Sequence, residues 1–302
     1  MMPRDGRPIV VGLGEVLWDL LPGGKQFGGA PANFAYHAQA LGARAYVVSC
    51  VGADALGEEI LGRLDALALS RDCVAIDTGH PTGTVSVELD AGGRPTYIIH
   101  ENVAWDFLRS GPAMLSLAGA ADAVCFGSLA QRSAVSRAAI RDFLAATGKD
   151  CLRIFDINLR QHYFDAETVA ASLSWATVLK LNDEELPVVA KLLSIGGTEE
   201  EILGTFCRRF DLRLIALTKG AQGSLLFTPG ESSTQAGLAV EVADTVGAGD
   251  AFTAALGMGM LAGLGLEVIN AHANRVARYV CSRRGATPPM PPELRKSYCG
   301  RP

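Results

Sequence analysis

The chain has 302 residues, of which 49% are hydrophobic and 20% are charged, a composition that excludes intrinsic disorder. Its net charge is −5 and it has no long run of basic residues, which excludes an obvious nucleic-acid or anionic-membrane partner. The seven cysteines are dispersed and form no Cys-x-x-Cys pair, as is typical of reduced thiols in a cytoplasmic protein.

Short, nearly continuous apolar runs along the chain predict buried β-strands. These runs cover residues 9–12, 45–51, 123–126, 154–157, 178–181 and 214–217. Strands that are apolar on both faces are typical of a parallel sheet covered by helices on both sides.

Helical patterns lie between these runs. Residues 31–41 repeat apolar side chains at helical spacing, with Pro31 suited to the first turn and Gly42 to the end. Asp54 is expected to cap a second helix, in which apolar residues recur at helical spacing over 60–67. Strands that alternate with helices predict an α/β fold: a doubly wound, mainly parallel sheet with helices on both faces.

Two segments depart from this alternation. Residues 84–89 alternate polar and apolar side chains, 91–94 (AGGR) form a turn, and 96–100 continue, which predicts a β-hairpin with one solvated face. Residues 16–27 form a second β-like piece around the turn at 22–24 (PGG). We expect the two pieces to pair into a small sheet over the binding site.

No linker or internal repeat divides the chain, so we expect one domain over 1–302. Its lid is predicted to come from insertions at about 15–30 and 82–106. The long uncharged stretch at 251–266 is shorter than the roughly 18–20 residues that span a bilayer, so it predicts a buried helix and no membrane partner.

Several common signatures of nucleotide enzymes are missing. Residues 12–14 (GLG) begin like a dinucleotide-binding fingerprint, but Leu17 stands where the third glycine is required, and the chain has no P-loop. The informative segment is 244–252 (DTVGAGDAF). Small residues before a helix expose N–H groups that bind an anion, and Asp250 would lie beside that anion as a proton acceptor.

This segment resembles the second signature of the ribokinase/PfkB carbohydrate-kinase family. Other motifs extend the resemblance over nearly the whole chain: residues 27–35 (FGGAPANFA), 41–43 (LGA), 51–57 (VGADALG), 156–160 (DINLR), 181–185 (LNDEE) and 218–223 (TKGAQG). The resemblance implies a ribokinase-like fold and an ATP-dependent sugar kinase.

The resemblance also assigns catalytic roles. Asp250 would be the base that takes the proton of the sugar hydroxyl. The N–H groups of Gly247, Ala248 and Gly249 would stabilise the transferring phosphoryl group, and Arg160 would hold its oxygens.

Four positions match those that bind sugar hydroxyls in the family: Asp19, Gly28, Gly29 and Asn33. A carboxylate and an amide can accept from and donate to neighbouring hydroxyls, while the glycines let the sugar approach the backbone. Glu101 and Asn102, at the end of the hairpin, are expected to close over the substrate.

For the nucleotide, the resemblance implies a loop shaped by Thr218, Gly220 and Gly223, and an adenine-side contact from Asn274. By the same resemblance, Asn182 would lie beside the bound nucleotide. With Glu185 it would also organise Mg²⁺, largely through water, since that ion loses its hydration reluctantly.

Some family members also bind a monovalent cation such as K⁺. The matching positions here are Asp244, Ser282 and Gly285.

The substrate is predicted from two motifs, 14–19 (GEVLWD) and 28–33 (GGAPAN), which are more similar to those of fructokinases than of ribokinases. Only Lys25 and Arg94 lie near them as cations, which disfavours a phosphorylated sugar. Fructose, phosphorylated at a primary hydroxyl, is therefore the predicted substrate, with 2-keto-3-deoxygluconate and ribose as alternatives. A catalytically silent sugar-binding protein is an alternative of another class. The lid would offer a surface for a homodimer.

Overall fold

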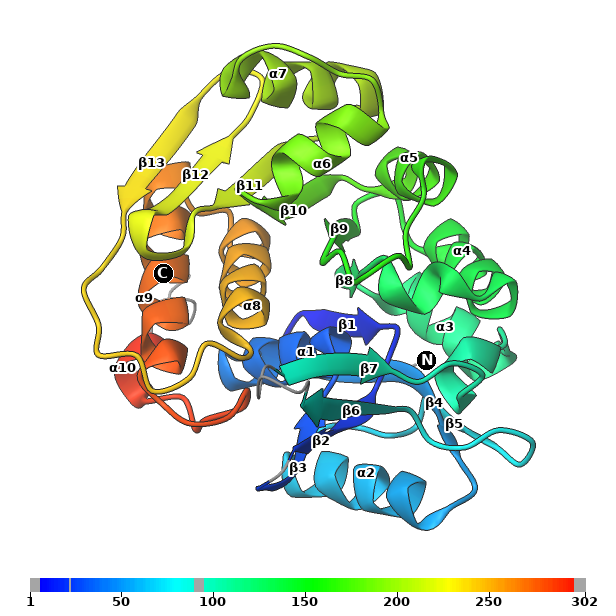
Figure 1. The fold of residues 1–302 in the computed structure, drawn as a ribbon. Helices are drawn as coiled ribbons and strands as arrows, with labels where there is room; N and C mark the ends of the chain where they lie inside the picture. The colour runs from blue at the N-terminus through cyan, green and yellow to red at the C-terminus, as the bar shows by residue number, and fades with distance from the viewer. Residues whose placement is uncertain (1–5, 22, 90–94, 296–302) are drawn as a thin grey trace.

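The computed structural model describes residues 6–21, 23–89 and 95–295, and its main feature is a nine-stranded sheet in the order β13-β12-β11-β10-β9-β8-β1-β4-β5 (Figure 1). Its strands are β1 (Ile9–Leu13), β4 (Arg44–Gly52), β5 (Val74–Asp77), β8 (Ala123–Phe126), β9 (Leu152–Asp156), β10 (Val178–Asn182), β11 (Leu214–Thr218), β12 (Gly223–Phe227) and β13 (Ser232–Ala236). All neighbours pair in parallel except β11 with β12 and β12 with β13. The predicted mainly parallel sheet and its six apolar strands are confirmed.

Helices cover both faces of this sheet. They are α1 (Ala30–Ala40), α2 (Ala55–Ala66), α3 (Pro112–Ala120), α4 (Ala134–Ala146), α5 (Ala166–Trp175), α6 (Glu185–Leu192), α7 (Glu199–Phe210), α8 (Ala248–Leu261), α9 (Leu266–Cys281) and the short α10 (Pro292–Arg295). Alternate strand residues point to opposite faces. Val10, Ile154 and Val178 therefore pack with α1, α8 and α9. The residues next to them along the same strands pack with α3–α7 on the other face.

The expected helix boundaries are confirmed in the first two helices. Pro31 lies in the first turn of α1, and Gly42 follows its end with φ +109°, which favours glycine. Asp54 caps α2, where its Oδ1 accepts the N–H of Gly57 at 2.8 Å.

The sequence predicts one helix over the uncharged stretch 251–266, and this prediction is wrong. The stretch forms the body of α8, a turn and the first residue of α9. Gly263 has φ +69°, a conformation that ends α8. Within the described ranges, no helix is long and apolar enough to cross a membrane.

A second sheet has the order β3-β2-β6-β7. Its strands are β2 (Leu17–Leu21), β3 (Gly24–Gly28), β6 (Thr84–Leu89) and β7 (Pro95–Ile99). The two β segments pair as predicted, through β2 and β6, which run in parallel. The predicted turn at 91–94, with Arg94, and Pro22 lie outside the described residues; so does Cys299, while the six cysteines within them are free.

A close approach between β1 and α1 explains the glycines of the GLG sequence. A Cβ at Gly12 would lie 1.9 Å from the carbonyl oxygen of Pro31, so only glycine lets the start of α1 lie against β1. This contact brings the first turn of α1 to the carboxyl end of the parallel strands, where α/β sheets bind their ligands.

Candidate active site

The candidate active site begins at the N-terminus of α8. Gly247 caps this helix with φ +80°, and a Cβ there would lie 2.6 Å from the carbonyl oxygen of Ala286, so only glycine fits. The first N–H groups of a helix have no partner within it and favour an anion. Among the expected donors, the N–H of Ala248 already bonds Thr245 O at 3.3 Å, whereas Gly249 follows in the first turn.

Asp250 also lies in this first turn, and Asn33 of α1 holds it. The side-chain amide of Asn33 donates to Asp250 Oδ2 at 2.8 Å. Burial, followed by the nearby carboxylate of Asp156, raises the pKa of Asp250 to about 6, although the bond from Asn33 and the charges of Lys180 and Arg160 act against this. Asp250 is thus mostly ionised at neutral pH and still basic enough to accept a proton.

A buried ion pair lies beneath this turn, and the role of its lysine was not predicted from the sequence. Lys180 Nζ of β10 lies 3.0 Å from Asp156 Oδ1 at the end of β9, and Thr253 of α8 donates to Asp156 Oδ2 at 2.8 Å. A Cβ at Gly249 would lie 3.2 Å from Lys180 Nζ. Strands β9 and β10 therefore fix the start of α8, and the absence of a side chain at Gly249 makes room for the ammonium group.

Four of the expected sugar-side residues lie in β2, at the end of β3 and at the start of α1, and among them Asn33 contacts Asp250. A Cβ at Gly28 would lie 2.6 Å from Asp19 Oδ2, and one at Gly29 would lie 2.5 Å from the carbonyl oxygen of Glu15. Burial raises the pKa of Asp19, while the charge of Arg160 lowers it; the same charge lowers the pKa values of Glu15 and Asp250. Arg160 is exposed and acts electrostatically on all three carboxyls.

Glu101 and Asn102 follow β7 and are both exposed. Glu101 Oε1 accepts the hydroxyl of Tyr163 at 2.8 Å, and Asn102 has φ +55°. Neither has a recorded contact with Asp250 or with the other expected sugar-side residues, so their closing role stays a prediction.

Two charged residues next to this group were missed. Glu15, two residues after the end of β1, is 4% exposed, and burial raises its pKa to about 7. Arg132 ends the short 3₁₀ helix η2 (Leu129–Arg132) and forms an ion pair with Asp106 at 2.8 Å. The sequence could have indicated both residues, because polar residues that follow the carboxyl end of a buried parallel strand often face the ligand.

The predicted magnesium residues cap the start of α6. The N–H of Glu185 donates to Asn182 Oδ1 at 2.7 Å, and the N–H of Asn182 donates to Glu185 Oε2 at 2.8 Å. Glu185 Oε1 accepts the N–H of Leu159 at 2.9 Å. Burial raises the pKa of Glu185, and the charge of Lys180 opposes this rise. Both carboxylate oxygens thus already accept main-chain bonds.

The expected nucleotide loop follows β11. A Cβ at Gly223 would lie 2.0 Å from the carbonyl oxygen of Gln235, so a close backbone approach explains this glycine; Gly220 has φ +52°. Thr218 donates to Leu181 O at 3.4 Å. The amide of Asn274 belongs to a polar network on α9, where it donates to Ser224 Oγ at 2.7 Å and to Asn270 O at 2.8 Å.

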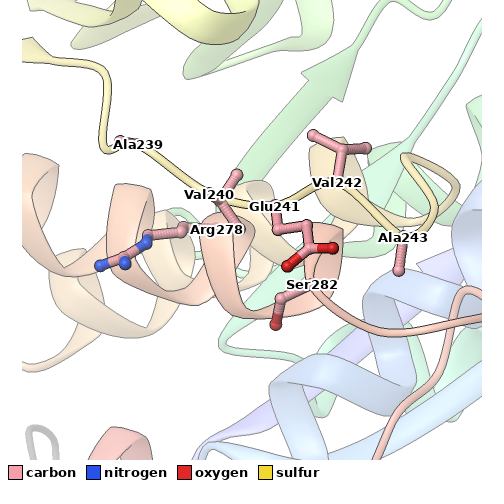
Figure 2. A pocket seen from close by; sticks show the side chains of 7 residues that line it. All are labelled: Ala239, Val240, Glu241, Val242, Ala243, Arg278 and Ser282. Carbon is pink, nitrogen blue, oxygen red and sulfur yellow. The ribbon is translucent and has the colours of Figure 1, made fainter.

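The proposed cation residues Asp244 and Gly285 are in contact, since the N–H of Gly285 donates to Asp244 Oδ2 at 3.0 Å. Ser282 donates to Tyr279 O within the same region. Figure 2 shows a pocket there, of about 630 Å³, where residues 239–243 cross α9 beside Arg278 and Ser282. The described residues contain no group of three or more His, Cys, Asp or Glu side chains that could hold a metal ion directly.

Comparison with known proteins identifies relatives along most of the chain. A sugar kinase of Pyrococcus horikoshii is 29% identical over 281 residues, 90% of this chain and 86% of the relative. Fructokinase-2 of Solanum habrochaites is 28% identical over 310 residues, 94% of this chain and 93% of the relative. The structure of the fructokinase from Vibrio cholerae O395 with fructose, ADP and a calcium ion has a TM-score of 0.79 and 27% identity, and covers 95% of this chain and 97% of that one.

The family model described as "pfkB family carbohydrate kinase" matches residues 22–293. This match spans the start of α8, the ion pair below it and most of the sugar-side residues. The chain belongs to the pfkB family of carbohydrate kinases, and it is a sugar kinase.

Proposed function

We propose that this sugar kinase transfers the γ-phosphoryl group of ATP to a primary hydroxyl of a neutral ketohexose, with fructose as the preferred substrate. One observation carries the proposal: Asp250, in the first turn of α8, is held at 2.8 Å by Asn33 of α1. The residues that would bind the sugar and the helix end that would bind phosphate therefore share one carboxylate.

The proposed chemistry follows from this arrangement. Asp250 accepts the proton of the attacking hydroxyl, the oxygen bonds to the γ-phosphorus, and the bond between this phosphorus and the oxygen of the leaving ADP breaks. The N-terminus of α8, around Gly247, Ala248 and Gly249, stabilises the negative charge of the transferring group. Arg160 supplies a further positive charge from its exposed position.

We assign the nucleotide to the side of α8 that faces α9. The pocket between residues 239–243 and α9 gives space beside the phosphate end, and Arg278 offers a positive charge to an anionic ligand. The loop of Thr218, Gly220 and Gly223 and the amide of Asn274 would bound the same ligand. The side-chain nitrogen of Asn274 already donates to Ser224, so we propose that the side-chain oxygen of Asn274 contacts the nucleotide.

Magnesium fits Asn182 and Glu185 only through water, because both Glu185 oxygens already accept main-chain N–H groups. Bound with ATP, the ion would neutralise phosphate charge. Asp244, with Ser282 and Gly285, is proposed as a monovalent-cation site, and activation by K⁺ over Na⁺ at constant ionic strength would test it.

Fructose is favoured over the alternatives by similarity to fructokinases. A coupled assay of ADP release with fructose, ribose, 2-keto-3-deoxygluconate, adenosine and fructose 6-phosphate tests the proposal. Turnover with fructose at the highest kcat/KM is expected. Turnover with another sugar alone would overturn the assignment of fructose as the substrate. No turnover with any of these compounds would favour a catalytically silent sugar-binding protein.

The small sheet is proposed as a lid and as the surface of a homodimer. Leu20 and Tyr97 lie on it with 37% and 54% of their surface exposed, and β3 and β7 are its edges. Sedimentation of the protein with and without sugar would test both roles.

A further inference from the structure

Arg132, whose charge acts on Glu15, is held in place by several partners. Its Nε and Nη2 donate to the two carboxylate oxygens of Asp106 at 2.8 Å each, and Nη2 also donates to the carbonyl oxygen of His100 at 2.6 Å. The guanidinium lies 4.0 Å from the ring centre of Trp105 and 4.7 Å from that of Tyr163. Its side chain is only 7% exposed, and its remaining nitrogen, Nη1, is buried without a hydrogen-bond partner.

The charges of both this arginine and the proposed catalytic residue, Asp250, act on the carboxyl of Glu15. A Cβ at the preceding Gly14 would lie 3.4 Å from Ala130 of η2, so the backbone before Glu15 packs against the 3₁₀ helix that carries Arg132. Glu15 Oε2 is buried and also lacks a hydrogen-bond partner.

Asn33 supplies a third such atom. Its amide nitrogen bonds Asp250, but its Oδ1 is buried without a partner. Leaving a buried polar atom unsatisfied costs about 1–3 kcal/mol, so a ligand or solvent that bonds these three atoms would remove this cost. Two acceptors and one donor match the hydroxyl groups of a sugar, each of which can both donate and accept.

We propose that Glu15 and Arg132 bind the hydroxyl groups at the end of the sugar remote from the one that is phosphorylated, and that this pair selects a neutral sugar. This inference rests on the proposed function. Arg132 already has its charge matched by Asp106, whereas no cation forms a recorded ion pair with Glu15 within the described residues. Of the cations whose charge acts on Glu15, Arg160 has no ion-pair partner among the described residues, so a carboxylate or phosphate on the substrate would have to share Arg160 with Glu15.

The test compares Glu15→Gln with the wild-type protein and with the control Glu231→Gln, which removes an exposed carboxylate from the turn between β12 and β13. Gln has nearly the shape of Glu and carries no charge, so the variant is expected to fold. The KM for fructose should rise by about tenfold in Glu15→Gln, the loss of one charged hydrogen bond, while the KM for ATP stays unchanged. The ratio of kcat/KM for 2-keto-3-deoxygluconate to that for fructose should increase, and the control should match wild type.

A second variant, Arg132→Lys, keeps the charge that Asp106 needs but loses the planar fork. It should also raise the KM for fructose, and the double variant should raise it by less than the product of the two single effects, because both residues bind neighbouring hydroxyls of one ligand. A wild-type KM for fructose in Glu15→Gln overturns the inference and leaves the proposed function intact. A wild-type protein that phosphorylates only a sugar acid, or no sugar at all, overturns the proposed function and the inference with it.

Discussion

Asn33 and Asp250 are 217 positions apart in the chain, and their side chains form a 2.8 Å hydrogen bond at the start of two helices. Asn33 follows Gly29, which caps α1 with φ +112°, and Asp250 follows the left-handed Gly247 that begins α8. The bond therefore joins the sugar side of the site to the phosphate side. The amide donates to the ionised carboxylate, which holds Asp250 in the state that can accept a proton.

Replacing Asp250 by Asn should remove the proton acceptor and preserve the shape of the site. We expect kcat to fall by at least about 10²-fold, the usual contribution of general-base catalysis, while nucleotide binding is retained. Steady-state kinetics and calorimetric titration with ADP measure the two quantities. Asp72→Asn, an exposed change outside the site, is the control, and near-normal turnover in Asp250→Asn would rule out this base.

The pH dependence of kcat at saturating fructose and ATP should reflect the same carboxyl, since saturation removes the effect that Glu15, whose pKa is raised to about 7, has on sugar binding. The pKa of Asp250 is raised to about 6, mainly by burial, and only the ionised form can accept a proton. Activity should therefore be low in acid, rise through a midpoint at about pH 6 and level off above it. A midpoint near 4, the ordinary value for an aspartate, would show that Asp250 does not limit the rate in this range.

Asn33→Asp should move this midpoint upward. It places a second carboxylate at hydrogen-bond distance from Asp250, and the two then titrate as a coupled pair whose upper pKa is raised by at least about one unit. Asn33→Ala removes the hydrogen bond without adding a charge, so its midpoint should rise less. Matching pH profiles for the two variants would contradict a direct interaction between positions 33 and 250 in the working enzyme.

The fold was largely predictable because its strands are apolar on both faces, as parallel strands between two helical layers must be. The exceptions have a physical cause. β13 has the sequence SSTQA at the edge of the sheet, where exposure removes the apolar signal, and the apolar stretch 251–266 gives no indication of the left-handed Gly263 that divides it.

The site was predictable only where family motifs mark it. Lys180 lies inside a run predicted as a buried strand, and its partner Asp156 is set by the parallel pairing of β9 with β10, which periodicity does not reveal. Glu15 and Arg132 follow different strands, and the charge of Arg132 acts on the Glu15 carboxyl because β1 and β8 are neighbours in the sheet. Sequence reasoning can mark both as polar residues after strands, but the order of the strands decides that they interact.

Lys180→Met should destabilise the protein because it leaves Asp156 buried without its counter-charge. Removing one partner of a buried ion pair costs about 3–5 kcal/mol, and Thr253 donates only a neutral hydrogen bond to the remaining carboxylate. Chemical denaturation measures the free energy of unfolding. Lys191→Met, at an exposed position on α6, should change it little, and equal stabilities of the two variants would contradict a structural role for the pair.

Gly247→Ala should damage the phosphate end of the site through the backbone. The φ of +80° is strained for alanine by about 1 kcal/mol or more, and the added Cβ would lie 2.6 Å from the carbonyl oxygen of Ala286. The first turn of α8 must then shift, so we expect kcat to fall by at least about tenfold, since displacing a group that stabilises the transition state has effects of this size or larger. Gly148→Ala is the matched control, because its Cβ would enter open space and its φ lies outside the positive range. Equal kcat values for the two variants would show that the turn at Gly247 tolerates a side chain and does not fix the phosphate site.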